Sequence, residues 1–167
     1  PHKIWRQGND GRGIDVVLMA REKTRDGRPI EVVNVRSHRK ATFDDYGLLT
    51  KDLADMGYEG KDRVFRRDCL EVDLRIGGRR ITIFTVHFKS MGSGRNGDDG
   101  RTYTMPVRIA EARAVRWIIQ EKFGSDRVAK MRWLICGDLN DYTERLVVNG
   151  DRTGGYTFNH IKEGSSG

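Results

Sequence analysis

A carboxylate and an amide stand one residue apart in the segment Gly137–Asn140, directly after the apolar run Trp133–Cys136. The run predicts a buried strand that leads into Gly137 and delivers Asp138 and Asn140 side by side in the following turn. Ligand sites in open α/β sheets tend to lie beyond strand ends. Together the two side chains could hold a hard cation and a phosphate-bound water. The alternative is an ordinary strand-to-turn boundary, where Asp and Asn are common.

Two other side chains could take part in such chemistry. His87 stands near the end of the apolar run Ile81–Phe88, just before a glycine-rich loop. An imidazole there could act as an acid or base at neutral pH, or be a hydrogen-bonded residue at the edge of the core. Arg12 has glycine on both sides, so its guanidinium could bind a phosphate through two N–H groups. The alternative for Arg12 is a solvated residue in an Asn-Asp-Gly turn.

The hydrophobic pattern predicts the strands that would position these side chains. Short apolar or alternating runs bounded by turn residues are typical of strands. Gly77-Gly78 predicts a β-hairpin, because glycine tolerates the positive φ of such turns, and the second strand of this hairpin is expected deeper in the sheet. In the first, Glu71, Asp73 and Arg75 alternate with apolar residues, which predicts one solvent-exposed face. The expected strands span Val16–Met19 (buried), Ile30–Val35, Leu70–Ile76, Ile81–Phe88 and Trp133–Cys136.

One long helix is expected between Thr104 and Gly124. Thr104 offers an N-cap, Pro106 a first-turn proline and Gly124 an end, with apolar residues at helical spacing between them. Residues 91–101 are rich in Gly, Ser, Asn and Asp and predict a loop. Beyond Tyr142 the pattern decays into turns and a small, polar tail. Strands interleaved with one long helix and a hairpin predict an α/β domain.

Composition limits the class of protein. The chain has 167 residues, with 31 Lys and Arg against 24 Asp and Glu, so its net charge is +7. This length suits one ordinary domain, and no apolar run is long enough for a membrane-spanning helix. Cys69 and Cys136 allow at most one disulfide, which excludes a disulfide-dense scaffold. Residues 1–9 lack the apolar stretch of a signal peptide, and the compartment stays open. The basic balance favours an anionic partner, although solubility alone accounts for it as well.

Taken together, these segments resemble the endonuclease/exonuclease/phosphatase superfamily, which holds DNase I-like nucleases, abasic-site endonucleases, sphingomyelinases and inositol polyphosphate phosphatases. The family's Gly-Asp-(Phe/Leu)-Asn motif corresponds to Gly137–Asn140, its histidine-ended strand to Val86–Ser90 and its phosphate-binding arginine to Arg12. The resemblance covers residues 8–142. It implies a DNase I-like sandwich of two mixed β-sheets flanked by helices, in four layers. The helix that precedes the motif in the family is similar to the one bearing Arg108, Glu111, Ala112 and Val115.

The resemblance also implies a hydrolase that cleaves a phosphodiester or phosphomonoester bond by metal-assisted attack of water, with Mg²⁺ or Mn²⁺. In the family, the residue matching Asp138 orients or activates the water, and the one matching Asn140 holds the phosphate and supports the metal. The residue matching His87 lies against the scissile phosphate, and the one matching Arg12 grips it. We therefore expect His87, Asp138 and Asn140 to be catalytic, Arg12 and Asn140 to bind phosphate, and Asp138 and Asn140 to bind metal.

The sequence departs from the family pattern at both ends. The family opens with strands that bear an asparagine and a metal-binding glutamate, and the resemblance places that glutamate before residue 1. The family closes with an Asp-His pair, whereas the late histidine here, His160, follows Asn159. The expectation is that residues 1–167 form one partial domain of a longer protein. This chain by itself is then expected to hydrolyse little or nothing.

These motifs leave the substrate open. A basic chain suits DNA or RNA, and equally an anionic lipid headgroup or an inositol phosphate. Scattered aromatic residues could stack on bases or simply fill core and surface. A non-catalytic nucleic-acid or phosphate-binding module on the same scaffold is the alternative function. Five arginines are expected to lie on solvated faces beside strands, namely Arg63, Arg66, Arg67, Arg79 and Arg80.

Overall fold

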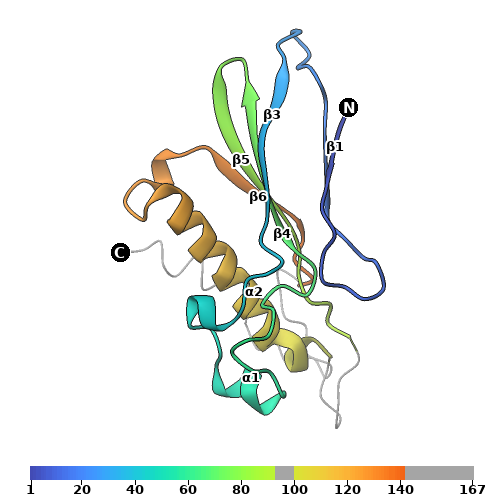
Figure 1. The fold of residues 1–167 in the computed structure, drawn as a ribbon, viewed down its shortest axis with the longest axis vertical. Helices are drawn as coiled ribbons and strands as arrows, with labels where there is room; N and C mark the ends of the chain where they lie inside the picture. The colour runs from blue at the N-terminus through green and yellow to red at the C-terminus, as the bar shows by residue number, and fades with distance from the viewer. Residues whose placement is uncertain (93–99, 142–167) are drawn as a thin grey trace, which may run out of the picture.

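The computed structural model describes residues 1–92 and 100–141, which form an α/β fold with two sheets (Figure 1). The strands are β1 (His2–Trp5), β2 (Val17–Ala20), β3 (Ile30–Ser37), β4 (Cys69–Ile76), β5 (Arg79–His87) and β6 (Trp133–Asp138). The α-helices are α1 (Lys51–Asp55) and α2 (Gly100–Phe123), and two short 3-10 helices are η1 (Asp44–Tyr46) and η2 (Val128–Lys130).

The larger sheet has four strands in the order β3-β4-β5-β6. The β3–β4 and β4–β5 pairs are antiparallel, whereas β5 and β6 are parallel and are connected through α2. Gly77 and Gly78, both with positive φ, make the hairpin turn between β4 and β5, as the sequence predicts. Because β5 and β6 are parallel, their C-terminal ends lie at the same edge of the sheet.

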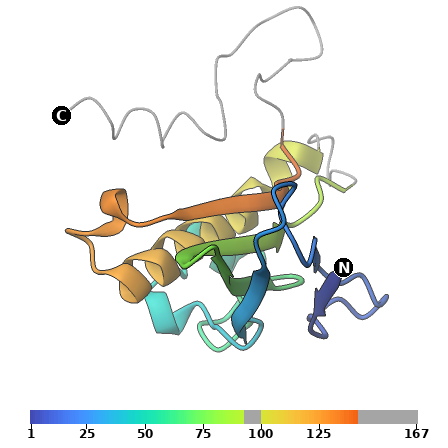
Figure 2. The same cartoon turned by 90° about the horizontal axis from the view of Figure 1, so that it is seen from above.

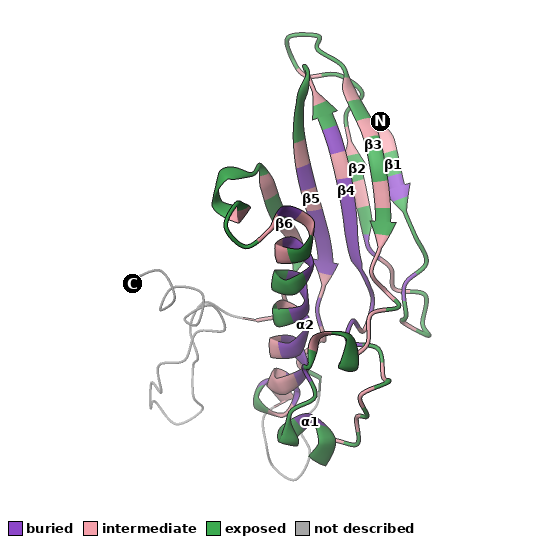
Figure 3. Ribbon diagram, turned by 60° about the vertical axis from the view of Figure 1, so that its left-hand side comes forward, coloured by how far each residue is buried: buried purple, intermediate pink, exposed green. Residues whose placement is uncertain are grey.

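Two hydrophobic clusters hold this sheet from opposite faces. Side chains of β4 alternate between the faces, so Cys69 packs with α2, whereas Leu70 and Val72 pack with β1 and β2. α2 runs along one face of the sheet (Figure 2). The buried residues gather on β4, on β5 and on the side of α2 toward them (Figure 3). The end of β5 is therefore carried on the buried part of the sheet.

All five strands that the sequence predicts are present, with their ends displaced by at most two residues. β5 has a strand on each side, in agreement with its expected position deep in the sheet. The end of the long helix at Gly124 is also confirmed, since this residue has a φ of 81° and follows Phe123 directly. β1 was not predicted, because it is four residues long and Ile4 is its single buried residue.

The predicted start of the long helix is wrong. α2 begins at Gly100, so Thr104 and Pro106 lie inside it. The Thr104 hydroxyl donates to the carbonyl oxygen of Gly100 at 2.7 Å instead of capping the helix. An ion pair between Arg101 and the buried Asp141 stabilises the earlier first turn. This contact is tertiary, and the local sequence therefore does not reveal it.

The alternation in β4 predicts a solvent-exposed Glu71, yet this residue is only 1% exposed. Its carboxylate accepts from Lys122 Nζ at 2.7 Å and contacts His38 Nε2 at 2.8 Å. Charged residues are almost never fully buried unless paired. Lys122 of α2 and His38 supply that pairing, so the polar face of β4 is covered by the helix.

Two apolar runs are less buried than the sequence predicts. Within the described sheet β6 is an edge strand, and its Leu134 and Ile135 are 38% and 40% exposed. In β2, Val17 and Met19 alternate with the residues that pack on β4 and are exposed. Apolar composition marks these segments as strands but does not tell whether another layer covers both of their faces.

Some expectations fall outside the described residues. They concern the loop residues 93–99, the turns and tail beyond Asp141, and His160 with its neighbours. Over residues 1–92 and 100–141, no helix combines the length and the apolar character that crossing a membrane requires.

Candidate functional site

His87 and Asp138 are register partners at the ends of β5 and β6. Partners in a parallel ladder project to the same face of the sheet. The two side chains consequently meet, with His87 Nε2 lying 3.8 Å from Asp138 Oδ2. The Asp138 side chain is 62% exposed and that of His87 is 25% exposed, so both are accessible to a ligand.

Gly137 makes this close pairing of the strand ends possible. Its φ is 133°, a conformation that favours glycine. A Cβ atom at this position would lie 1.8 Å from the carbonyl oxygen of Val86 on β5, far inside van der Waals contact. The glycine of the Gly137–Asn140 segment is thus required because the backbone of β6 lies close beside that of β5 at this position.

Asn140 folds the turn after β6 back onto the end of β5. Its φ of 50° is left-handed, which asparagine tolerates better than most residues. Its backbone N–H donates to Asp138 Oδ1 at 2.8 Å, and its Nδ2 donates to the carbonyl oxygen of Phe88 at 2.9 Å. The same carbonyl accepts from an Arg67 guanidinium nitrogen at 3.0 Å. The Phe88 carbonyl therefore joins the Asp138–Asn140 turn to Arg67.

Asp141, the next residue, anchors this turn to α2. Its carboxylate is fully buried between two arginines of the helix, forming an ion pair with Arg101 and one with Arg108 Nε at 3.2 Å. Arg108 also donates to the Thr104 hydroxyl at 2.6 Å and to the carbonyl oxygen of Arg101 at 2.7 Å. Sequence reasoning missed the role of Asp141. The signal was Arg101, Thr104 and Arg108 at helical spacing on one face.

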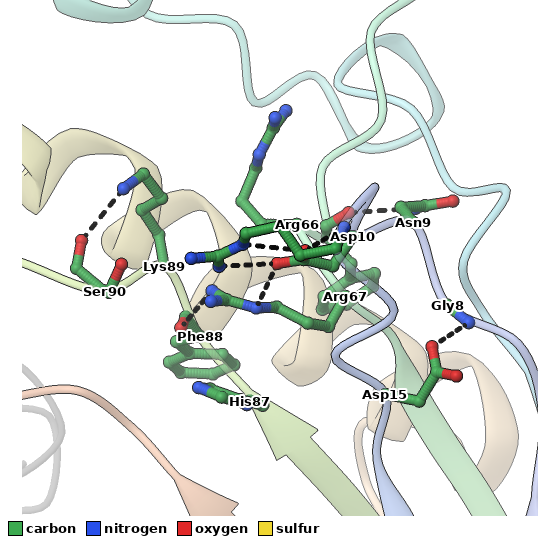
Figure 4. Close-up of polar contacts among 12 residues, drawn as sticks. Gly8, Asn9, Asp10, Asp15, Arg66, Arg67, His87, Phe88, Lys89 and Ser90 are labelled. Atoms are coloured by element: carbon green, nitrogen blue, oxygen red, sulfur yellow. Dashed lines mark hydrogen bonds and ion pairs between the residues drawn. The ribbon is translucent and has the colours of Figure 1, made fainter. Parts of the chain in front are cut away.

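The predicted phosphate ligand Arg12 is engaged by a neighbouring carboxylate. Its guanidinium donates to both oxygens of Asp10, with Nε–Oδ1 and Nη2–Oδ2 distances of 3.1 and 2.9 Å. Arg67 contacts the same carboxylate, with its Nε 3.2 Å from Oδ2. Figure 4 shows Asp10 beside the Arg67 side chain, which reaches the Phe88 carbonyl above His87. Arg12 is thus linked to the end of β5 through its contacts with Asp10, which contacts Arg67, which in turn donates to the Phe88 carbonyl.

Arg67 corrects the expectation that five arginines are solvated. It is 3% exposed, whereas Arg63, Arg79 and Arg80 are exposed as expected and Arg66 is half-buried. Burial of a guanidinium requires partners, and here these are Asp10 and the Phe88 carbonyl. Sequence reasoning missed Asp10, Arg67 and Lys89 as site residues, because the three come from loops that are far apart in the chain.

These loops enclose a pocket of about 250 Å³. Its lining carries four cationic side chains against one carboxylate. We call it the basic pocket, and its lining residues are Asn9, Asp10, Gly11, Arg12, Arg66, Arg67, Lys89 and Ser90. A larger cavity of about 300 Å³ lies between α1 and α2 and is lined by none of the candidate site residues.

A buried glutamate on α2 holds two sides of the basic pocket together. Glu111 is 0% exposed and accepts the backbone N–H of Arg66 at 2.9 Å and that of Lys89 at 2.6 Å. Burial raises its pKa to about 7, although the two backbone hydrogen bonds oppose the shift. Glu111 therefore fixes the spacing of two loops whose side chains line the pocket.

The electrostatics of the site follow from burial and from this concentration of arginines. Burial and the nearby positive charge of Arg67 lower the pKa of His87, which favours the neutral form of its imidazole. Hydrogen bonds from Arg12 hold the pKa of the Asp10 carboxyl far below its usual range. Burial, then the charges of Arg67 and Arg66, lower the pKa of Lys89. The site thus places a neutral imidazole beside a positively charged pocket.

The donor set at the strand ends matches a hard cation in kind. Asp138 offers carboxylate oxygens, and Asn140 keeps its side-chain oxygen because its Nδ2 is bonded to Phe88. Mg²⁺ prefers oxygen ligands and commonly takes only one or two from carboxylates, with water and substrate phosphate completing its shell. Across the part of the chain that the structure describes, no three His, Cys, Asp or Glu side chains cluster as a metal site. Among the described residues, the strand ends therefore offer a cation two oxygen-bearing side chains, those of Asp138 and Asn140.

Comparison of this chain with protein-family models, with curated proteins and with solved structures found no match. The site is therefore interpreted from its own chemistry.

Proposed function

We propose that this chain carries the site of a divalent-metal-dependent phosphoesterase, on a scaffold related to the DNase I-like sandwich. The observation that supports the proposal best is the convergence of His87, Asp138 and Asn140 at one edge of the sheet, beside the basic pocket. Phosphoryl transfer is catalysed mainly by positioning and by neutralising charge. A carboxylate, a neutral imidazole, an amide and several guanidinium groups are the side chains that this chemistry requires.

Each of these side chains has a distinct part in the proposed reaction. The exposed Asp138 carboxylate orients a water molecule and accepts its proton as the oxygen attacks phosphorus. The neutral His87 imidazole donates a hydrogen bond to a phosphate oxygen, and Asn140 donates the second N–H of its Nδ2, the one not bonded to Phe88, to another phosphate oxygen. Arg12 adds positive charge at the rim. As the new P–O bond forms, the bond to the leaving oxygen breaks, that oxygen takes up a proton from solvent water, and Asp138 then returns its proton to solvent. A bound Mg²⁺ or Mn²⁺ would supply further neutralisation of phosphate charge.

A non-catalytic phosphate-binding module is the second candidate. The observation that favours it is the basic pocket itself, because four cations around one carboxylate attract a phosphate whether or not bond cleavage follows. The two candidates differ in what they predict for His87 and Asp138. A binding module needs neither a neutral imidazole nor an exposed carboxylate at the strand ends.

Hydrolysis under single-turnover conditions tests the proposal, because excess protein detects slow cleavage. The substrates are an end-labelled oligonucleotide and bis(p-nitrophenyl) phosphate, each with Mn²⁺ or with chelator. Because this chain by itself is expected to hydrolyse little, we expect slow cleavage that chelator abolishes and that falls below detection in Asp138→Asn and His87→Ala. Arg63→Ala is the matched control, because Arg63 is exposed and outside the pocket. Cleavage unaffected by both site variants would refute the proposal, and phosphate binding without cleavage would favour the binding module.

A further inference from the structure

We propose that the basic pocket binds a second phosphate group of the substrate, next to the phosphate that faces His87 and Asp138. This inference rests on the proposed function and names its substrate class, an ester that carries a phosphate beside the scissile one. A neighbouring phosphate in a nucleic-acid strand and a small bisphosphate share this chemistry. The pocket is a separate subsite, because His87, Asp138 and Asn140 are not among its lining residues.

The pocket has the size and the charge of a phosphate site. Its volume of about 250 Å³ is several times the ~30 Å³ that a water molecule occupies in the liquid. Gly11 on its wall has open space where a side chain would otherwise project. Of the charged groups in its lining, four are cations and Asp10 is the single carboxylate. Bound water and one phosphate group therefore fit, and the charge favours an anion.

Two of these cations are held without a carboxylate partner. The Arg66 guanidinium lies over the Tyr58 ring, 5.8 Å from its centroid, and Lys89 Nζ donates to the carbonyl oxygen of Ser90 at 3.1 Å. In residues 1–92 and 100–141, no carboxylate forms an ion pair with either group. An aromatic face and a carbonyl orient a cation but leave its charge uncompensated. Arg66 and Lys89 are consequently ready to bind an anion.

The buried wall of the pocket is equally suited to an anion. The Arg67 side chain is 4% exposed, and its Nε is within 3.2 Å of Asp10 Oδ2 without the alignment of a hydrogen bond. This buried guanidinium adds a positive charge to the wall of the pocket, and that charge favours an anion. Arg67 is at the same time held by the Phe88 carbonyl. The buried charge in the wall of the pocket is thus fixed to the strand end that carries His87.

The pocket is also preorganised before any ligand binds. Glu111 accepts the backbone N–H groups of Arg66 and Lys89, which come from separate loops, and so sets the distance between their Cα positions. Because these bonds use backbone atoms, a substitution of either side chain leaves the Glu111 contacts in place. Preorganised donors lose less entropy on binding. The arrangement therefore allows Arg66 and Lys89 to be tested singly without dismantling the loops.

Binding of matched ligand pairs tests this subsite. The first pair is a thymidine dinucleotide with and without a 5′-phosphate, and the second is propanediol bisphosphate against its monophosphate. Affinities are measured by calorimetry with chelator present, so that no hydrolysis occurs. For the wild-type protein we expect about tenfold tighter binding of the ligand with the extra phosphate. The preference should fall to within about twofold in Arg66→Ala and Lys89→Ala and persist in Arg63→Ala, with thermal melts checking that each variant is folded.

The outcomes separate the subsite from the proposed function. A preference in the dinucleotide pair alone supports a nucleic-acid strand as the source of the second phosphate, and a preference in both pairs supports any bisphosphate. Equal affinity within both pairs for the wild-type protein, or a full preference in both pocket variants, would overturn the subsite. Hydrolysis without any preference for the extra phosphate would support the proposed function and contradict the subsite. Conversely, a preference for the extra phosphate without any hydrolysis would support the subsite and contradict the proposed phosphoesterase function.

Discussion

His87 Nε2 lies 3.8 Å from Asp138 Oδ2, and the two residues are register partners on parallel strands. They come together only because β5 and β6 run in the same direction, so that both strands deliver their last residues to one edge. The charge of Arg67 opposes protonation of the imidazole, whereas the carboxylate of Asp138 favours it. The pKa of His87 therefore depends on how close Arg67 and Asp138 lie to its imidazole.

The first prediction is that Asp138→Asn lowers the pKa of His87 further. Removing a nearby negative charge disfavours the imidazolium, so the histidine should titrate at a lower pH than in the wild-type protein. NMR titration of the His87 ring proton measures the shift. Asp55→Asn, at an exposed carboxylate paired with Lys51, is the control and should leave the titration unchanged. An unchanged or raised pKa in Asp138→Asn would contradict the pairing of the two strand ends.

The second prediction concerns Gly137. Gly137→Ala should destabilise the fold by about 3 kcal/mol or more, because the new Cβ would clash with the Val86 backbone and the φ of 133° is strained for alanine. Urea denaturation measures the change in the free energy of unfolding. Gly11→Ala is the matched control, since a Cβ there meets open space, and its effect should stay within about 0.5 kcal/mol. Equal stabilities of the two variants would show that β6 does not pass so close to β5.

The third prediction is that Asp141→Asn costs about 3–5 kcal/mol of stability. The substitution removes the negative charge from a carboxylate that is fully buried between Arg101 and Arg108. The exposed pair Lys51–Asp55 provides the comparison, and breaking it with Asp55→Asn should cost about 0–1 kcal/mol. Chemical denaturation of both variants gives the two values. A cost for Asp141→Asn as small as that of the surface pair would mean that the turn is not anchored to α2.

Much of the fold could be predicted from local patterns. The alternation in β4, the Gly77-Gly78 turn and the glycine after α2 each have a local cause, and each is present in the structure. The burial of Glu71 and the start of α2 at Gly100 depend on partners far away in the chain. Periodicity reports which residues share a face, but it does not report what covers that face, and this is where the predictions were wrong.

The candidate site could likewise be predicted only in part from the sequence. The side chains on strand ends, His87 and Asp138, could be selected from sequence because an apolar run followed by a turn marks a strand end. The basic pocket could not be found in this way, because Asp10, Arg67 and Lys89 come from three separate loops. Arg67 in particular has no local sign of burial. Its burial results from the ion contact with Asp10 and the hydrogen bond to Phe88.

The last prediction concerns Glu111 and the pH dependence of stability. Burial raises the pKa of Glu111 to about 7 in the folded protein, from an ordinary value of 4.5. Between these two values the folded state binds more protons than the unfolded state, so this residue makes stability fall as pH rises. Its contribution is complete below about pH 4.5 and lost above about pH 7, with an amplitude on the order of 3 kcal/mol.

Glu111→Gln should remove this slope, because the amide does not titrate. Its NH₂ group would face one of the two backbone N–H groups of Arg66 and Lys89, so the variant should be less stable than the wild-type protein by about 1–3 kcal/mol at pH 5. That gap should narrow or reverse at pH 8, where the wild-type carboxylate is ionised and buried. Urea denaturation across this range measures both curves, with Glu121→Gln, an exposed carboxylate on the same helix, as the control. A constant gap between wild type and Glu111→Gln from pH 5 to pH 8 would show that Glu111 does not titrate in this range.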